Sequence, residues 1–406
     1  MSAKIYIALP VLNELDYISA CLDSISKQTY RNFELWVCVN QAEAWHNDYS
    51  KKEIIDNNQQ TIYLLNQITS IPIHIIDKSS KGKGWDNKKA CVGWARKVAM
   101  DAISTKADKN DIVLSLDADT TFDENYFQSI INIFENKPKA VAMANPYYHQ
   151  LTDDETLNRA VLRYEIYMRY YAINMFRIGS QYSYTALGSA ITVPNWAYIA
   201  IGGITPKKSG EDFYFLQKLT KYGVVVKYNT ETVFPATRYS DRVFFGTGPA
   251  LIKGSTGDWE SYPIYHYSLF DHIKKTQDLY PTLFTNNIDT PLSFFLMQQF
   301  KEENIWLPLR NNFKDIKQFI KACHHKIDGL RILQYLKTMQ KQIFQSDETN
   351  LKDYLLKFIP NDKLKELNIN FETFSFAQSP IEELNELRDF LMQQELVYQK
   401  EEYEHI

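Results

Sequence analysis

The first 245 or so residues alternate between short apolar runs and segments whose apolar positions recur at helical spacing. The apolar runs are typical of buried strands and lie at 5–9, 33–39, 71–76, 111–116, 140–144, 188–193 and 224–228. The helical spacing lies at 15–26, 90–99, 157–175 and 211–219, with a mostly helical insertion over 43–70. Alternating strands and helices predict an α/β class, with a mainly parallel sheet flanked by helices.

Strand patterns end at about residue 251, and the rest of the chain is amphipathic. Helical segments are predicted at 293–303, 313–324, 329–344, 351–359 and 381–399. We therefore expect two domains, 1–250 and 251–406. The second is basic in its middle and acidic at its end. Solvated helix faces explain this pattern, and a basic face toward an anionic membrane or polymer is the alternative.

Composition narrows the class of protein. Apolar residues make up 45% of the 406 residues and charged residues 23%, as in ordinary soluble proteins. The net charge of -4 gives no basic footprint for nucleic acid. The four cysteines show no CxxC or disulfide spacing, and no apolar run reaches the length of a membrane span. Residues 1–4 lead directly into a strand, so no signal peptide is expected. We expect a cytoplasmic protein.

Two carboxylates follow the apolar run at 111–116. Asp117-Ala118-Asp119 should lie outside the carboxyl end of a strand, where open α/β sheets bind their ligands. Acids at this spacing can offer oxygen ligands to Mg²⁺ or Mn²⁺, a metal that a phosphorylated ligand would share. A solvated loop is the alternative. The polar segment 120–124 is predicted to begin a helix.

Three further segments fall at the ends of predicted elements. They are Pro10-Val11-Leu12-Asn13-Glu14, Gly210-Glu211-Asp212 and Arg238-Tyr239-Ser240-Asp241-Arg242. Taken in order with Asp117-Ala118-Asp119, they resemble the bacterial family 2 inverting glycosyltransferases of the GT-A fold. The likeness covers roughly residues 4–250. It implies a Rossmann-like, mixed but mainly parallel sheet and the transfer of a sugar from a nucleotide donor.

The resemblance implies a donor pocket at the end of the first strand. Pro10, Asn13 and Glu14 would line it, although Asn13 and Glu14 could also cap the following helix. Asn40 stands where the family usually has an aspartate that hydrogen-bonds the base. This departure leaves the nucleotide open between a UDP-sugar and a GDP-sugar.

The resemblance also implies a metal and a clamp for the diphosphate. Asp119 would coordinate Mn²⁺ or Mg²⁺, and Asp117 would reach the ribose, the sugar or the metal. His266 is the candidate third ligand, with a structural histidine as the alternative. Arg238 and Arg242 are four residues apart, which would place both on one side of a helical turn, where they could grip the diphosphate. Surface ion pairs are the alternative for these two arginines.

The catalytic base implied by the resemblance is Asp212. Glu211 would orient the acceptor or adjust the pKa of its neighbour, and ordinary acids in a first helical turn are the alternative. The expected function is that of a metal-dependent inverting glycosyltransferase of the hexosyltransferase type. It would act on a glycan or lipid-linked acceptor in cell-surface polysaccharide biosynthesis, in the cytoplasm or at the inner face of the membrane. The alternative is a non-catalytic module that binds nucleotide sugar or glycan.

Overall fold

The computed structural model describes residues 3–241 and 246–406. The chain divides into two compact units. The first comprises Met1–Val161, Tyr184–Thr256 and Gln399–Ile406, and the second comprises Leu162–Ser183 and Gly257–Tyr398. This division differs from the expected domains 1–250 and 251–406. Two long helices, α5 (Glu155–Arg177) and α17 (Ile381–His405), each contribute residues to both units.

The first unit contains a mixed, mainly parallel sheet, as expected. Among the described residues, seven strands form it in the order β3-β2-β1-β4-β7-β6-β8, and β7 alone runs antiparallel to its neighbours. The strands are β1 (Ile5–Val11), β2 (Phe33–Asn40), β3 (Ile73–Lys78), β4 (Ile112–Ser115), β6 (Ala142–Ala144), β7 (Ile191–Pro194) and β8 (Val225–Val226).

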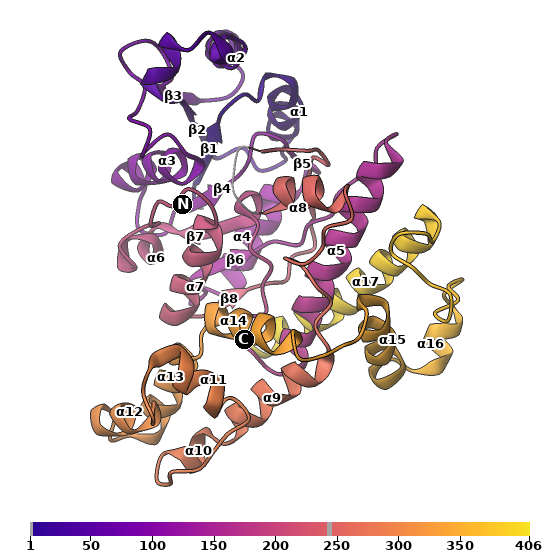
Figure 1. Ribbon diagram of the computed structural model, residues 1–406. Coiled ribbons are helices and arrows are strands. Elements are labelled where there is room, and N and C mark those ends of the chain that lie inside the picture. The colour runs from indigo at the N-terminus through magenta and orange to yellow at the C-terminus, as the bar shows by residue number, and fades with distance from the viewer. Residues whose placement is uncertain (1–2, 242–245) are drawn as a thin grey trace. The chain divides into compact units, whose positions relative to one another are not determined.

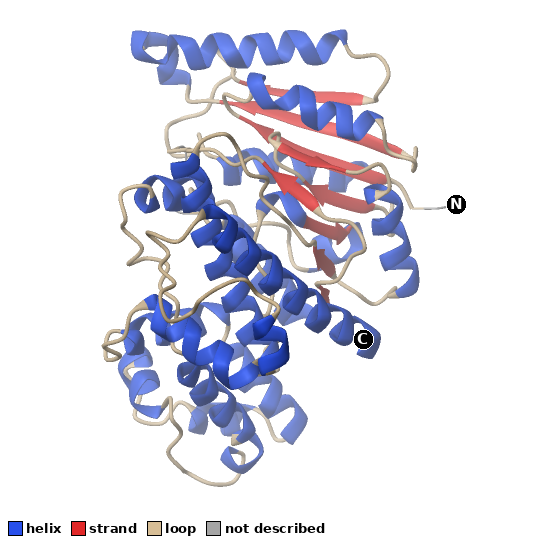
Figure 2. Ribbon diagram, turned by 90° about the vertical axis from the view of Figure 1, so that its right-hand side faces the viewer, coloured by secondary structure: helices blue, strands red, loops and turns tan. Residues whose placement is uncertain are grey.

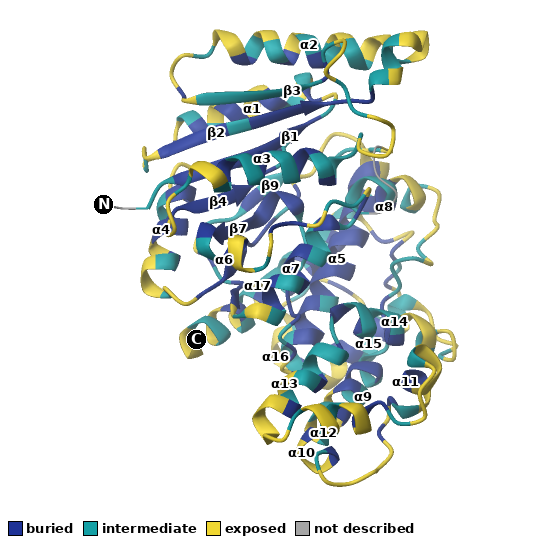
Figure 3. Ribbon diagram, turned by 90° about the vertical axis from the view of Figure 1, so that its left-hand side faces the viewer, coloured by how far each residue is buried: buried dark blue, intermediate teal, exposed yellow. Residues whose placement is uncertain are grey.

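The centre of this sheet forms the core of the unit. Every residue of β1 and of β4 is buried, and only Trp36 of β2 is partly exposed (Figure 3). Such near-continuous apolar runs are typical of strands covered on both faces. Helix α3 (Val92–Lys106) packs along β1, β2 and β4, with α1 (Leu15–Ser26) and α4 (Tyr126–Asn136) on the opposite face (Figure 1). The carboxyl ends of β1, β2 and β4 therefore meet at one edge of the sheet.

The predicted helices at 15–26, 90–99, 157–175 and 211–219 correspond to α1, α3, α5 and α7 (Glu211–Tyr222), and α1 has the predicted bounds. Residues 43–51 form short 3-10 turns ahead of α2. The helices are α1 (Leu15–Ser26), α2 (Lys52–Gln67), α3, α4 (Tyr126–Asn136), the start of α5, α6 (Asn195–Ala200), α7 (Glu211–Tyr222), α8 (Thr247–Gly254) and the end of α17.

The predicted helix start at 120–124 is wrong. Residues Thr120–Phe122 form strand β5, which pairs antiparallel with β9 (Val233–Pro235). Two β-branched residues followed by an aromatic one favour a strand, and Thr120 and Phe122 are buried while Thr121 between them is partly exposed. The helix begins instead at Tyr126. This two-stranded sheet brings the segment after Pro235 next to the Asp117–Asp119 turn.

The second unit is helical, as expected, and its described residues form no strand (Figure 2). Its helices are the rest of α5 and of α17, with α9 (Tyr267–Asp278), α10 (Tyr280–Leu283), α11 (Ser293–Phe300), α12 (Trp306–Asn312), α13 (Ile316–Lys326), α14 (Gly329–Gln340), α15 (Asp347–Phe358) and α16 (Asn361–Lys365). Buried Arg169 of α5 pairs with Glu165 and with Glu395 of α17, which ties these two helices together. In the described part of the chain, no helix has the length and apolar character needed to cross a membrane.

Candidate active site

The segment after β1 takes its shape from α2. Asn13 has a left-handed backbone with φ of 57°, and its N–H donates to Asn58 Oδ1 at 2.9 Å. The N–H of Leu15 donates to Asn57 Oδ1 at 3.2 Å. Glu14 occupies the N-cap position of α1, but its side chain makes no capping hydrogen bond. The buried Glu14 carboxylate is instead bound by an arginine from far along the chain.

That arginine, Arg238, joins two of the acids that the sequence predicted for the site. Its Nη2 donates to both carboxylate oxygens of Glu14 at 2.8 Å, and its Nε donates to Asp119 Oδ2 at 3.0 Å. The guanidinium also lies over the Tyr17 ring, 4.1 Å from the centroid. Burial opposes the guanidinium charge, but Asp119 and Glu14 outweigh that effect and raise the pKa of Arg238. We call Glu14, Asp119 and Arg238 the outer cluster.

A second arginine joins the other two acidic segments. Arg96 of α3 is 2% exposed, and its Nη2 donates to Asp117 Oδ1 at 2.8 Å. Its Nε donates to Glu211 Oε1 at 3.3 Å, and its Nη1 donates to the Gly188 carbonyl at 2.9 Å and to Ser115 Oγ. Burial opposes the charge, but the acids raise the pKa of Arg96. We call Asp117, Arg96 and Glu211 the inner cluster. The two clusters are adjacent because the turn Asp117–Asp119 contributes one acid to each of them.

Gly188 leaves the space that the Arg96 guanidinium occupies. A Cβ at this position would collide with the arginine Nη2. We expect Gly188→Ala to destabilise the protein by about 1–3 kcal/mol, as overpacking of a buried site does. Thermal unfolding of the variant would measure this loss. An unchanged Tm would contradict the tight fit between Gly188 and Arg96.

Asp212 lies beside the inner cluster, in the first turn of α7. Gly210 precedes this helix with a left-handed φ of 72°, and Asp212 Oδ1 accepts from the N–H of Phe213 at 2.7 Å. Burial, followed by the charge of Glu211, raises the pKa of Asp212 to about 7. A general base works best when its pKa is near the working pH. The environment of Asp212 therefore suits proton abstraction at neutral pH better than that of an ordinary exposed aspartate.

The two clusters together with Asp212 carry an excess of negative charge. Five carboxylates face two guanidinium groups, so three negative charges remain when all of these groups are ionised. Hard cations such as Mg²⁺ prefer carboxylate oxygens, and proteins often supply only one or two while substrate phosphates complete the shell. In residues 3–241 and 246–406, no three His, Cys, Asp or Glu side chains assemble into a metal site. The carboxylates fit a divalent cation that is shared with a phosphorylated ligand.

The remaining predicted donor residues lie at the same edge of the sheet or outside the described part. Pro10 is buried within β1. Asn40 ends β2, and its Nδ2 donates to the Val11 carbonyl at 2.9 Å, while its buried Oδ1 has no hydrogen-bond partner among the described residues. Arg242 lies outside the described residues. The expected helical turn at Arg238 is wrong, because residues 236–241 are irregular.

His266, the predicted third metal ligand, belongs to the second unit. It occupies the N-cap position of α9, where its Nδ1 is 2.7 Å from Ser268 Oγ and its Nε2 is 3.8 Å from Asp353 Oδ2. Burial lowers its pKa. These contacts agree with the structural alternative, and a role in metal binding stays a prediction.

Sequence reasoning missed Arg96. Its neighbours on the buried face of α3 are Ala95, Ala99, Met100 and Ile103. A single arginine on an otherwise apolar helix face was the available signal, because a buried charge requires partners. Its partners Asp117 and Glu211 are 21 and 115 residues away, so the sequence alone did not identify them.

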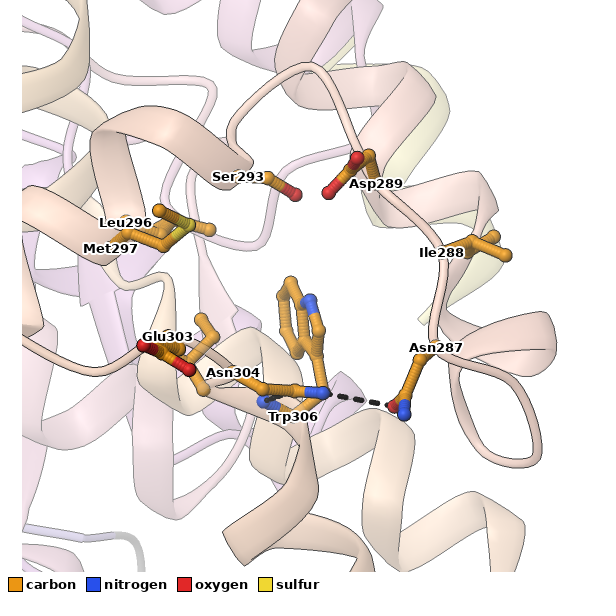
Figure 4. Close-up of a pocket in the computed structure, with 10 residues that line it drawn as sticks. Asn287, Ile288, Asp289, Ser293, Leu296, Met297, Glu303, Asn304 and Trp306 are labelled. Carbon is orange, nitrogen blue, oxygen red and sulfur yellow. Dashed lines mark hydrogen bonds between the residues drawn. The ribbon is translucent and has the colours of Figure 1, made fainter.

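A small pocket lies in the second unit, and none of the residues predicted for the site lines it. Figure 4 shows the Trp306 side chain surrounded by the other lining residues, which come from the loop before α11, from α11 itself and from the loop before α12. Its volume of about 160 Å³ is below the roughly 300–1,000 Å³ of typical ligand sites. It is lined by Asn287, Ile288, Asp289, Ser293, Leu296, Met297, Glu303, Asn304, Ile305 and Trp306.

Several solved structures resemble the chain weakly, among them the following two. One is Staphylococcus aureus TarS 1-349 in complex with UDP-GlcNAc, with 12% identity, a TM-score of 0.41, and coverage of 84% of this chain and 91% of that chain. The other is the mannosyltransferase PcManGT from Pyrobaculum calidifontis in complex with GDP-Man and Mn²⁺, with 11% identity, a TM-score of 0.39, and coverage of 98% and 88%. Similarity of this degree does not bear on the activity of the chain. No curated protein matches it.

The match to a protein family is more extensive. The model of the glycosyltransferase like family 2 matches residues 3–213, which is just over half of the chain. This stretch contains β1, the Asp117–Asp119 turn and the start of α7, and therefore most of both clusters. The chain belongs to the glycosyltransferase like family 2.

Proposed function

We propose that the first unit is an inverting glycosyltransferase that uses Asp212 as its general base. It would transfer a sugar from a UDP- or GDP-sugar to a hydroxyl group of a glycan or lipid-linked acceptor in cell-surface polysaccharide synthesis. The observation that carries the proposal is the position of Asp212 beside the inner cluster, at the sheet edge where such folds bind ligands. Burial at this position raises the pKa of Asp212 to about 7. Family membership supports the reaction class.

In this proposal each cluster has a task. Asp212 takes the proton of the acceptor hydroxyl as that oxygen attacks the anomeric carbon from the side opposite the diphosphate. Glu211 is fixed by Arg96 Nε, and its charge helps to keep the pKa of Asp212 near neutrality. Asp119, with Asp117, would hold Mn²⁺ or Mg²⁺, which supplies Lewis-acid stabilisation of the departing nucleoside diphosphate when it is bound. Pro10, Asn13, Glu14 and Asn40 would contact the nucleotide.

A panel of UDP- and GDP-sugars with Mn²⁺ tests this proposal. Many transferases slowly pass donor sugar to water, so release of nucleoside diphosphate can be followed before the acceptor is identified. We expect the wild type to bind and slowly hydrolyse one class of donor, and Asp119→Ala to bind it more weakly. Donor binding without any turnover would favour a non-catalytic module. If no donor bound, the transferase proposal would fail.

The pH dependence of turnover tests the role of Glu211. Because the pKa of Asp212 is raised to about 7, the ionised base accumulates as the pH rises through that value. We expect kcat/KM to fall on the acidic side of about pH 7. Glu211→Gln removes the neighbouring charge but keeps an acceptor for Arg96, so the pKa of Asp212 should fall. The acidic limb of the pH profile, where kcat/KM decreases, should then move to lower pH.

The same shift has a consequence for folding. A carboxyl group whose pKa is raised by folding favours the folded state only at low pH, and this contribution is lost as the pH rises through the folded-state value.

Glu231→Gln is a suitable control for the kinetic test of Glu211, because burial also raises the pKa of Glu231 but the residue lies outside both clusters. An acidic limb that is the same in wild type and Glu211→Gln would refute the coupling of Glu211 to Asp212.

A further inference from the structure

In the outer cluster, the positively charged Arg238 is bound to Asp119, the carboxylate proposed to bind the metal. Asp119 Oδ2 accepts from both Nε and Nη2 of Arg238, at 3.0 and 2.5 Å. The side chain of Asp119 is 17% exposed and that of Arg238 is 14% exposed, so solvent screens this pair only in part. An oxygen that accepts two charge-assisted hydrogen bonds is a poor ligand for a second cation.

Other contacts hold Arg238 in this position. Glu14 accepts from Nη2 through both of its oxygens, and the Tyr17 ring lies against the guanidinium. Glu14 and Tyr17 come from the start of α1, Asp119 follows β4, and Arg238 follows β9. The guanidinium is therefore fixed by two separate segments and is not a loose surface side chain that happens to meet an acid.

We propose that Arg238 is a built-in competitor of the divalent cation, occupying Asp119 while no donor is bound. This inference rests on the proposed function, because it takes Asp119 as the metal ligand. Metal entry then requires the guanidinium to leave Asp119, and a guanidinium released from a carboxylate can donate to phosphate oxygens in the same bidentate manner. Arg238 would thereby disfavour binding of the metal alone and favour its binding together with a nucleoside diphosphate.

The test is a titration with Mn²⁺ in the absence of nucleotide, followed by calorimetry or by the electron paramagnetic resonance signal of free Mn²⁺. We expect Arg238→Gln to bind Mn²⁺ at least about tenfold more tightly than the wild type, a difference of about 1.4 kcal/mol. Arg238→Lys keeps the charge but cannot span both acids, so an intermediate gain is expected. Lys27→Gln, which loses a surface pair with Asp23, should match the wild type.

Folding and specificity need their own controls. Arg238→Gln removes the ion pairs of Arg238 with Glu14 and Asp119, so its Tm should be lower and should rise more on addition of Mn²⁺ than that of the wild type. Adding Asp119→Asn to Arg238→Gln should remove both the affinity gain and the rise in Tm. If Arg238→Gln does not fold, Arg238→Lys decides the question: unchanged or weaker Mn²⁺ binding than the wild type overturns the proposal.

The outcomes separate this inference from the proposed function. If the wild type binds Mn²⁺ in the presence of UDP or GDP but neither Arg238 variant binds the metal more tightly without nucleotide, Arg238 is not a competitor and the proposed function stands. If the wild type binds no Mn²⁺ even with UDP or GDP, the metal dependence of the proposed function and the inference fail together.

Discussion

Asp212→Asn is expected to reduce turnover by about 10²–10⁴-fold, the usual contribution of a general base. The substitution keeps the size of the side chain and an oxygen that can accept from the N–H of Phe213, so the start of α7 should be preserved. Donor affinity should change little, because the proton is abstracted from the acceptor. Steady-state rates with the donor selected from the panel, together with donor binding, would measure both effects.

A matched control is needed for this substitution. Glu231→Gln also neutralises a partly buried acid whose pKa burial raises, and it should keep wild-type turnover. Full turnover by Asp212→Asn would show that another group takes the proton. A variant that loses turnover and donor binding together would indicate damage to the site as a whole, and its Tm would show whether the protein still folds stably.

Arg96→Met is expected to destabilise the protein by about 3–5 kcal/mol, the usual result of removing one partner of a buried ion pair. Methionine retains apolar volume, so the main loss is the positive charge that compensates Asp117 and the buried Glu211. The free energy of unfolding, measured by urea denaturation, tests this expectation. Lys27→Ala removes a well-exposed surface pair and should have little effect.

The origin of the Arg96 effect can be checked by removing the charges that it compensates. Adding Asp117→Asn and Glu211→Gln to Arg96→Met should restore part of the lost stability, because the negative charges that Arg96 compensates are then gone. If the triple variant were less stable than Arg96→Met alone, packing rather than charge would account for the role of Arg96. Near-wild-type stability of Arg96→Met would contradict the importance of the inner cluster.

Local patterns in the sequence predicted most of the first unit. The helix at 15–26 and the strand starts at Ile5 and Phe33 agree with the structure because apolar periodicity is encoded over a few neighbouring residues. The turn at Asp117–Asp119 and the helix start at Glu211 were placed correctly for the same reason. Each of these parts of the site is formed by one short, continuous stretch of sequence.

Features that depend on distant pairs could not be predicted in this way. The residues of Thr120–Phe122 favour a strand, but the pairing partner β9 lies more than 110 residues later, and the local sequence gave no sign of that partner. Arg96 and Arg238 each join acids from two separate segments, and only the folded chain brings these groups together. Residues 162–183 were assigned to the first domain because nothing in helix α5 marks where one unit ends.

If Asp212 is the base of a single displacement, the acceptor oxygen attacks the face of the sugar opposite the leaving diphosphate. Proton nuclear magnetic resonance of the product, recorded early in the reaction with a donor of known anomeric configuration, shows which face was attacked. We expect a product whose anomeric configuration is opposite to that of the donor. A product that retains the donor configuration would contradict it, because a single displacement assisted by one base cannot give that outcome.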